Sequence, residues 1–261
     1  MRKVYFDKLP AYQFHLLQKF SDQVNHAVFS REGGFSEDPY ASLNLSFSDY
    51  DKYDNVKKNR QAVCHALKLE DGRLLSMNQV HGDTIQVIDE AFLESFEPFS
   101  EINDLDGMVT NLKGVGLMVK IADCQGQIYF DPVKRVIASV HAGWRGLVKD
   151  ISGRAIKIMK EKFGSDPQNI MVGIAPSLGP CCAFFSNPEK ELPENFQKFV
   201  DPEKRVNLWE YSIEQLMSHG IQKENIELAR VCTMCGGGLK FYSHRRDHGI
   251  GGRFGVVISL L

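Results

Sequence analysis

The stretch that most constrains how this chain can fold is residues 106–140, where short β-type segments follow one another with little room for helices. These segments occupy residues 106–110, 116–121, 127–130 and 135–140. The last of them, RVIASV, is nearly all apolar, as a strand covered on both faces is. Strands this closely spaced predict packed β-sheets rather than a helical bundle.

The rest of the chain mixes strand and helix patterns without an internal repeat or a composition shift that would indicate a linker. We therefore expect one α+β domain over residues 1–261, with packed sheets and outer helices. Further strands are predicted at residues 25–30, 41–47, 74–77, 84–88, 170–174, 241–244 and 254–261, and helices at 54–69, 150–163, 189–199 and 208–219.

Charge and hydropathy exclude two broad classes of partner. The formal net charge is −2, so neither a nucleic-acid nor a membrane surface is expected. No run of 18 apolar residues is present, and the first residues, MRKVYFD, lack the apolar segment of a signal peptide. A cytoplasmic protein is expected, as a monomer or a weak homo-oligomer.

Three separated residues carry the strongest chemical signal. His81 lies in NQVHGD, Cys124 in ADC and His141 in HAGWRG, each at a predicted strand end or in a tight turn. Two imidazoles and one thiolate with a fourth position left open are what catalytic zinc requires. The alternative is that Cys124 is a small buried apolar residue and that the histidines are hydrogen-bonded polar groups of the core.

Two acids flank these residues in sequence. Asp123 precedes Cys124, and Asp83 follows His81 by two residues. Either carboxylate could orient a ligand imidazole or carry a proton. Turn-capping aspartates are the alternative.

Three arginines are candidate anion binders. Arg31 precedes two glycines whose backbone could approach a phosphate or a ribose closely, and Arg145 is four residues past His141. Arg60 lies within the predicted helix over residues 54–69. Solvated surface arginines are the alternative.

The remaining clustered cysteines predict metal or thiol chemistry rather than disulfides, since no signal peptide is present. Residues 181–182 are adjacent cysteines, and residues 232–235 form a Cys-x-x-Cys. The first pair could belong to a second metal site, to a redox element or to a buried turn. The second pair could bind a structural zinc with His244 and His248.

At this point the motifs resemble those of a known family. The chain is similar to the laccase-like polyphenol oxidases, a family later described as zinc-dependent purine nucleoside phosphorylases and adenosine deaminases and also linked to peptidoglycan editing. The resemblance covers nearly the whole chain. It rests on residues 29–34 (FSREGG), 42–45 (SLNL), 78–82 (NQVHG), 106–110 (DGMVT), 122–124 (ADC), 141–146 (HAGWRG), 179–182 (GPCC) and 243–247 (SHRRD).

The resemblance implies a four-layer α-β-β-α sandwich with mixed sheets and zinc on His81, Cys124 and His141, with copper as the less favoured alternative. It implies phosphorolysis of adenosine, inosine, guanosine and methylthioadenosine, and hydrolytic deamination of adenosine. Purine nucleosides and phosphate would be the partners. Carried onto this chain, the catalytic residues would be Cys124, His141, Asp123 and Asp83, and the substrate-binding residues Arg31, Asn44, Arg60 and Arg145.

The chain departs from the family pattern at two positions. Gly126 stands where the family usually has proline, and His244 where it usually has an aromatic residue. We expect Gly126 to loosen the loop that carries Cys124, which would affect rate and substrate preference more than metal binding.

Two other functions compete with the nucleoside enzyme. A metal-free cysteine amidase would use Cys124 as nucleophile and His141 as base, with peptidoglycan precursors among its substrates, but it leaves His81 without a role. A non-catalytic, zinc-stabilised binding module would unfold when the metal is lost. An oxidoreductase is the weaker interpretation, because multicopper chemistry would need more clustered histidines than this chain has.

Overall fold

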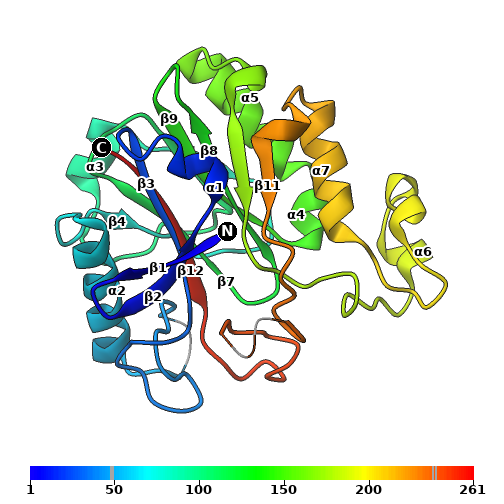
Figure 1. The fold of residues 1–261 in the computed structure, drawn as a ribbon, viewed down its shortest axis with the longest axis horizontal. Coiled ribbons are helices and arrows are strands. Elements are labelled where there is room, and N and C mark those ends of the chain that lie inside the picture. Colours follow the sequence, from blue (N-terminus) through cyan, green and yellow to red (C-terminus); the bar gives the residue numbers. More distant parts are fainter. Residues whose placement is uncertain (48–49, 237, 239) are drawn as a thin grey trace.

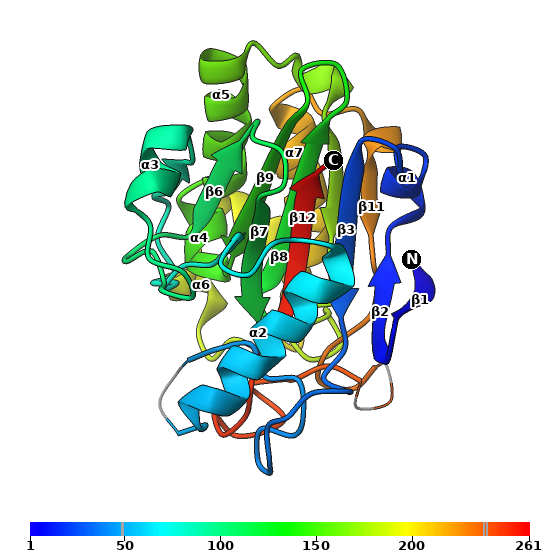
Figure 2. The ribbon, with the colours of Figure 1, turned by 90° about the vertical axis from the view of Figure 1, so that its left-hand side faces the viewer.

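Two mixed sheets packed face to face form the centre of the computed structural model, which describes residues 1–47, 50–236, 238 and 240–261 (Figures 1 and 2). Within these residues each sheet has six strands. The first, in spatial order, consists of β1 (Arg2–Phe6), β2 (Leu9–Gln13), β3 (Val24–Phe29), β12 (Phe254–Leu260), β7 (Gly116–Ile121) and β4 (Leu74–Leu75). The second consists of β11 (Ile226–Leu228), β10 (Met171–Ile174), β8 (Gln125–Asp131), β9 (Val136–Ala142), β6 (Gly107–Thr110) and β5 (Ile85–Val87).

Strand direction makes both sheets mixed. The pairs β4–β7, β5–β6 and β10–β11 at the sheet edges are parallel, and the other pairs are antiparallel. Apolar side chains from both inner faces, among them Val119, Ile128 and Val256, fill the space between the sheets. The nearly continuous apolar pattern of β9 is explained because all seven of its residues are buried.

Helices cover the two outer faces and complete the predicted α-β-β-α layers. Helix α2 (Tyr53–Leu67) packs Val63 and Leu67 on the first sheet, while α5 (Ile151–Phe163) packs Ala155 and Met159 on the second (Figure 1). The second sheet is also covered by α4 (Trp144–Val148) and α7 (Leu208–Ser218). Short helices complete the fold: α1 (His15–Gln18), α3 (Glu90–Ser95), α6 (Pro188–Glu191) and the 3-10 turns Pro167–Asn169, Glu194–Phe199 and Lys223–Asn225.

The predicted helices over residues 54–69, 150–163 and 208–219 are confirmed. Nearby residues explain where α5 begins and ends. Helix α5 begins after Asp150, whose side chain accepts the N–H of Gly153 at 3.2 Å. It ends at Gly164, whose φ of 70° is the left-handed conformation that glycine adopts without strain. No helix among the described residues is long and apolar enough to cross a membrane.

Three secondary-structure predictions are wrong. Residues 41–47 are irregular rather than a strand, because Ser42 and Leu43 donate their N–H groups to the carbonyl of Arg31 instead of to a neighbouring strand. Residues 241–244 are also irregular. The predicted helix over residues 189–199 is interrupted at Pro193, since a residue before proline favours extended backbone and Leu192 has φ −122° and ψ 140°.

Candidate metal centre and substrate cavity

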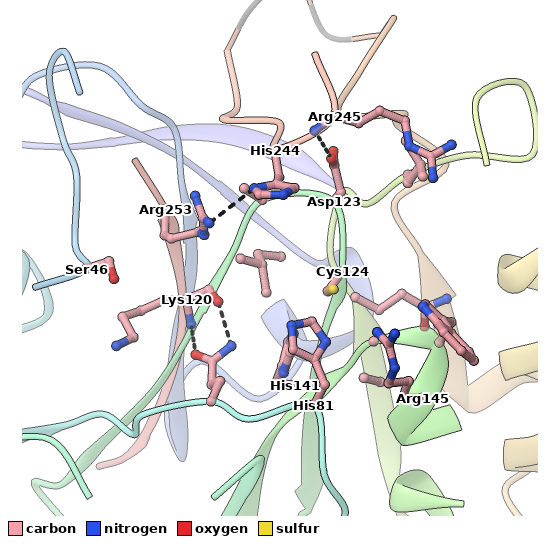
Figure 3. Close-up of a pocket in the computed structure, with 18 of the residues that line it drawn as sticks. Ser46, His81, Lys120, Asp123, Cys124, His141, Arg145, His244, Arg245 and Arg253 are labelled. Atoms are coloured by element: carbon pink, nitrogen blue, oxygen red, sulfur yellow. Dashed lines mark hydrogen bonds between the residues drawn. The ribbon is translucent and has the colours of Figure 1, made fainter. Parts of the chain in front are cut away.

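The three predicted ligand residues converge where the chain passes from one sheet to the other. Strand β7 belongs to the first sheet and β8 to the second, and Cys124 lies in the short link between them. His141 lies on β9, opposite Gly126 of β8, and His81 comes from the loop after β4. The ligand atoms of His81, Cys124 and His141 lie within 4.8 Å of one another. Figure 3 shows the three side chains grouped together.

This donor set fits a zinc ion of the catalytic type, which takes three protein ligands and keeps one position for substrate or water. A glycine makes the close approach possible. A Cβ atom at Gly143 would lie 2.7 Å from Nδ1 of His81 and 3.2 Å from Sγ of Cys124, so a larger residue would push the donors apart. The close approach of the donors therefore explains why the HAGWRG motif has glycine at position 143.

Asp106 organises both histidines. Its fully buried carboxylate lies 2.7 Å from Nδ1 of His141 and accepts the backbone N–H groups of His81 at 3.1 Å and Gly82 at 2.6 Å. A carboxylate on the second ring nitrogen of a ligand histidine sets its tautomer and ring orientation. The imidazole-orienting acid is thus Asp106, whereas the sequence pointed to Asp83 or Asp123.

Charge coupling keeps the site cysteine ionised. Burial alone would raise the pKa of Cys124, but the imidazole of His141 and hydrogen bonds from both histidines lower it to about 6. Burial opposes charge on His141 as well, yet the Cys124 thiolate and the Asp106 carboxylate raise its pKa to about 9. The thiolate is therefore favoured at neutral pH, and it is the form that binds a metal or attacks an electrophile.

The three residues form part of the wall of a cavity of about 700 Å³. Its lining combines aromatic and cationic side chains, a composition suited to a flat base and an anion. The aromatic members are Phe47, Trp144 and Phe185. The basic members are Lys120, Arg145, His244, Arg245 and Arg253, which Figure 3 labels.

The two predicted acids lie in different surroundings. Asp123 lines the cavity, where it accepts the hydroxyl of Thr233 at 2.6 Å and the N–H of Arg245 at 2.7 Å. Asp83 is outside the cavity lining and forms an ion pair with Arg154 at 2.7 Å. The structure therefore brings only Asp123 into the same cavity as the three donors.

Among the predicted substrate-binding residues, only Arg145 lines the cavity. Arg31 stacks on the ring of Tyr242 at 4.6 Å and donates to the carbonyl of Ala41. Asn44 is buried and joins residues 44–46 to Arg253, whose N–H it accepts at 2.9 Å. Both side chains hold loops next to the cavity.

Arg60 is almost fully buried and forms an ion pair with Glu101. Glu101 also pairs with Lys120, and both of these residues line the cavity. Burial is the main reason that the pKa of Lys120 falls to about 8, and the nearby guanidinium of Arg60 adds to it. Arg60 therefore acts on the cavity only indirectly, through its ion pair with Glu101 and its effect on Lys120.

Sequence reasoning missed Asp106, Glu101 and Lys120 as members of the site. Asp106 had a visible signal, because it opens the DGMVT segment directly before a buried strand. Lys120 had one too, as the lone charge in the otherwise apolar strand over residues 116–121. Glu101 had none, since its importance comes from pairing with residues 41 and 19 positions away in sequence.

The two departures from the family pattern have structural explanations. Gly126 lies within β8 and not in a loop, so the expected loosening of a Cys124 loop is wrong. A Cβ atom at Gly126 would come within 3.2 Å of Val256, Val119 and Ile121, so the packing between the sheets leaves little room for a side chain there. His244 lies on the cavity wall, with Nδ1 3.5 Å from the guanidinium of Arg253.

The fold and the site together describe a two-sheet protein with a possible metal centre in an enzyme-like cavity. Residues 25–261 match the family model described as multi-copper polyphenol oxidoreductase laccase, and the chain belongs to that family. The resemblance inferred from the motifs is thereby confirmed.

Named relatives point to a kind of activity. The chain is 30% identical to "Purine nucleoside phosphorylase YlmD" of Bacillus subtilis, over 88% of this chain and 86% of that protein. It is 28% identical to "Purine nucleoside phosphorylase" of Bacteroides thetaiotaomicron, over 94% and 93%. The solved structure of the Bacillus licheniformis "hypothetical protein YfiH" superposes with a TM-score of 0.86, at 26% identity and 98% coverage of both chains. These relatives support an enzyme that acts on purine nucleosides with phosphate.

Proposed function

We propose that this chain is a zinc-dependent purine nucleoside phosphorylase, with adenosine, inosine, guanosine and methylthioadenosine as substrates. The observation that carries the proposal is one cavity that combines the donors of His81, Cys124 and His141 with a cationic wall and three aromatic side chains. Its volume of about 700 Å³ is within the range of small-molecule sites, about 300–1,000 Å³. The names of the relatives support the same reaction class.

The cationic wall would bind phosphate. Arg145 stacks over the ring of Trp144 at 4.3 Å, an arrangement that keeps the guanidinium at the cavity wall. Lys120 and Arg253 contribute positive charge from the first sheet and the segment before β12. Guanidinium groups bind phosphate in a fixed geometry, and so they would hold the dianion for attack on C1′ of the ribose, where positive charge develops.

The aromatic side chains would hold the purine. Trp144 and Phe185 meet edge to face with ring centroids 5.8 Å apart, and Phe47 lies over the guanidinium of Arg60 at 4.0 Å. Flat apolar faces of this kind bind a heterocycle by stacking, and they exclude water from the reacting bond. The base and the phosphate would then occupy different parts of one cavity.

The chain's own residues divide the remaining work. His81, Cys124 and His141 would hold the zinc ion, which supplies Lewis acidity when bound. Asp106, 2.7 Å from Nδ1 of His141, orients the ring and would leave the other ring nitrogen for the zinc ion, which displaces its proton on binding. Copper remains a less favoured occupant of the same donors.

Hydrolytic deamination of adenosine is the second activity we propose, on the position of Asp123. Asp123 directly precedes Cys124, and its carboxylate lines the cavity, where it could carry a proton to the leaving ammonia. Asp83, also expected to be catalytic, lies outside this lining and would act only through Arg154. The two acids therefore form a matched pair for the test.

The test is incubation of zinc-loaded protein with adenosine, with and without phosphate, followed by chromatography of adenine and inosine. We expect phosphate-dependent adenine, lost in His81→Ala and Cys124→Ala. We expect Asp123→Asn to abolish inosine, and Asp83→Asn to leave both products near wild-type amounts. Absence of both products from the zinc-loaded wild type would exclude the proposal.

The same assay separates the competing functions. A cysteine amidase built on Cys124 and His141 would keep its activity in the presence of a chelator and in His81→Ala. A zinc-stabilised binding module would show no turnover and would unfold when the metal is removed. The phosphorylase would lose activity in chelator and recover it when zinc is restored.

A further inference from the structure

A second group of metal-type donors lies outside the cavity lining, on two loops that leave neighbouring strands. Cys181 and Cys182 follow β10, and Cys232 and Cys235 follow β11, the parallel neighbour of β10. The four Sγ atoms all lie within 4.8 Å of one another. Residues 181–182 and 232–235 are about 50 positions apart in sequence, so this cluster is a product of the tertiary fold.

Backbone contacts hold one of these sulfurs in place. Sγ of Cys232 accepts the N–H of Gly179 at 3.3 Å, and it also accepts the backbone N–H groups of Met234 and Cys235. A backbone pairing between Ser177 and Cys232 fixes the two loops to each other. These contacts place N–H donors around a sulfur, which favours its thiolate form, the form that binds metals.

We propose that Cys181, Cys182, Cys232 and Cys235 bind a structural zinc ion as four thiolates. A tetrahedral site with Zn–S distances of about 2.3 Å has sulfurs about 3.8 Å apart, so the observed cluster needs only small adjustments. The Cys-x-x-Cys of residues 232–235 has the usual spacing of half such a site. The adjacent cysteines at 181–182 supply the other half, which sequence analysis had sought in His244 and His248.

Four sulfurs this close favour a cation for an electrostatic reason. Sγ of Cys181 and Sγ of Cys235 lie 3.3 Å apart. Adjacent thiolates repel one another, and a divalent cation replaces that repulsion with attraction. A structural site has all four positions filled by protein, so no position is left for substrate.

The location gives the ion a defined task. Thr233, between the two cysteines of the second loop, donates its hydroxyl to Asp123 of the cavity wall. The carbonyl of Cys182 accepts from the guanidinium of Arg245 at 2.7 Å, which is another residue of that wall. Zinc at the cluster would therefore fasten the two loops that hold Asp123 and Arg245 in place.

The experiment measures zinc per full-length chain by elemental analysis and native mass spectrometry. The variants are Cys181→Ser/Cys235→Ser, which changes two exposed side chains, His81→Ala at the other site, and Cys64→Ala as a buried cysteine outside both clusters. We expect two ions in the wild type and in Cys64→Ala, and one ion in each of the other two proteins.

Cobalt substitution distinguishes which ion is lost. Of the five proposed thiolate ligands, four belong to this cluster and one is Cys124. The double variant should therefore lose roughly four-fifths of the thiolate-to-cobalt absorption, and His81→Ala should retain most of it. One ion in the wild type that the double variant retains would overturn the proposal. So would fewer than six free thiols in chelated, unfolded wild type, because that result would indicate a disulfide.

This inference and the proposed function fail separately. A protein that binds two zinc ions but converts no nucleoside would retain the structural site and lose the phosphorylase. A wild type that is active with a single bound ion, where that ion is absent from His81→Ala, would support the phosphorylase and exclude the structural site.

Discussion

The two donor clusters of this protein differ in the elements that carry them. His81, Cys124 and His141, called the seam cluster below, converge beside the cavity where the chain passes from one sheet to the other. His141 lies within β9, and Cys124 directly precedes β8. The cysteines at 181–182 and 232–235 lie on loops. Rigid strands suit a site that must hold geometry while substrates change, whereas loops need a ligand to hold them together.

Their partners differ in the same way. The seam cluster rests on a buried carboxylate, Asp106, which contacts two of its three members and fixes ring orientation. In the four-cysteine cluster, Sγ of Cys232 accepts backbone N–H groups, which favour its thiolate form, and the cluster lies outside the cavity lining. In proteins generally, donor count, the partner behind each ligand and access to a cavity separate a reactive metal centre from a structural one, and the two clusters differ in all three respects.

The largest expected effect comes from removing the charge that organises the seam cluster. Asp106→Asn should lower zinc affinity and phosphorolysis together by about 100-fold, since loss of a carboxylate behind a ligand histidine costs 10- to 100-fold. Chelator competition and initial rates measure the two effects. Asp131→Asn, a buried carboxylate at the opposite end of β8, is the matched control and should leave both unchanged. An unchanged zinc affinity in Asp106→Asn would contradict the assigned role.

An intermediate effect is expected from crowding the same cluster. Gly143→Ala places a Cβ atom 2.7 Å from Nδ1 of His81, so the ring must shift, and misplacing a reacting group by about 1 Å can cost up to 100-fold. We expect about a tenfold loss of activity and zinc affinity, while cobalt absorption from the four-cysteine cluster stays unchanged.

Gly153→Ala on α5 is the control for that change. Its Cβ would crowd His219 and Asp150, away from the cavity lining, so it should lower stability without lowering zinc affinity. Equal losses of zinc affinity in the two alanine variants would show that general destabilisation, and not contact with His81, causes the effect.

The smallest expected effect tests a region that belongs to neither cluster. Burial lowers the pKa of His26 to about 4, and its Nε2 accepts the N–H of Phe14 at 2.8 Å. The folded state therefore binds the proton less readily than the unfolded chain, whose histidine pKa is near 6.5. Stability is complete above pH 6.5 and falls as the pH drops from 6.5 towards 4.

Between pH 7 and pH 5.5 the free energy of unfolding should fall by about 1 kcal/mol through His26 alone. Urea titrations of chelator-treated protein at the two pH values measure it, and His26→Gln should lack this part of the decrease. An identical pH dependence in the variant would show that acid destabilises the fold through other groups. This comparison keeps acid effects on the metal clusters separate from those on the core.

The sequence by itself identified His81, Cys124 and His141 as candidate donors through their motifs. It also predicted the long helices and most of the central strands, because periodicity and turn residues act over short distances along the chain. It misassigned residues 41–47, whose alternation suggested a strand, and residues 241–244. Ser42 and Leu43 donate to the carbonyl of Arg31, and the carbonyls of Ser243 and His244 accept the N–H groups of Asp247 and Gly249, so turn contacts take the place of strand pairing.

Only the tertiary structure decided which distant residues meet. The pairing of β6 with β9 places Asp106 behind His141, and the parallel pairing of β10 with β11 brings the four cysteines together. Arg60 shows the same limit, because the sequence offered either an anion binder or a solvated surface arginine, whereas the side chain is buried and paired with Glu101. The identity of a donor is a local property of the chain, whereas its neighbours depend on strand pairing and sheet packing.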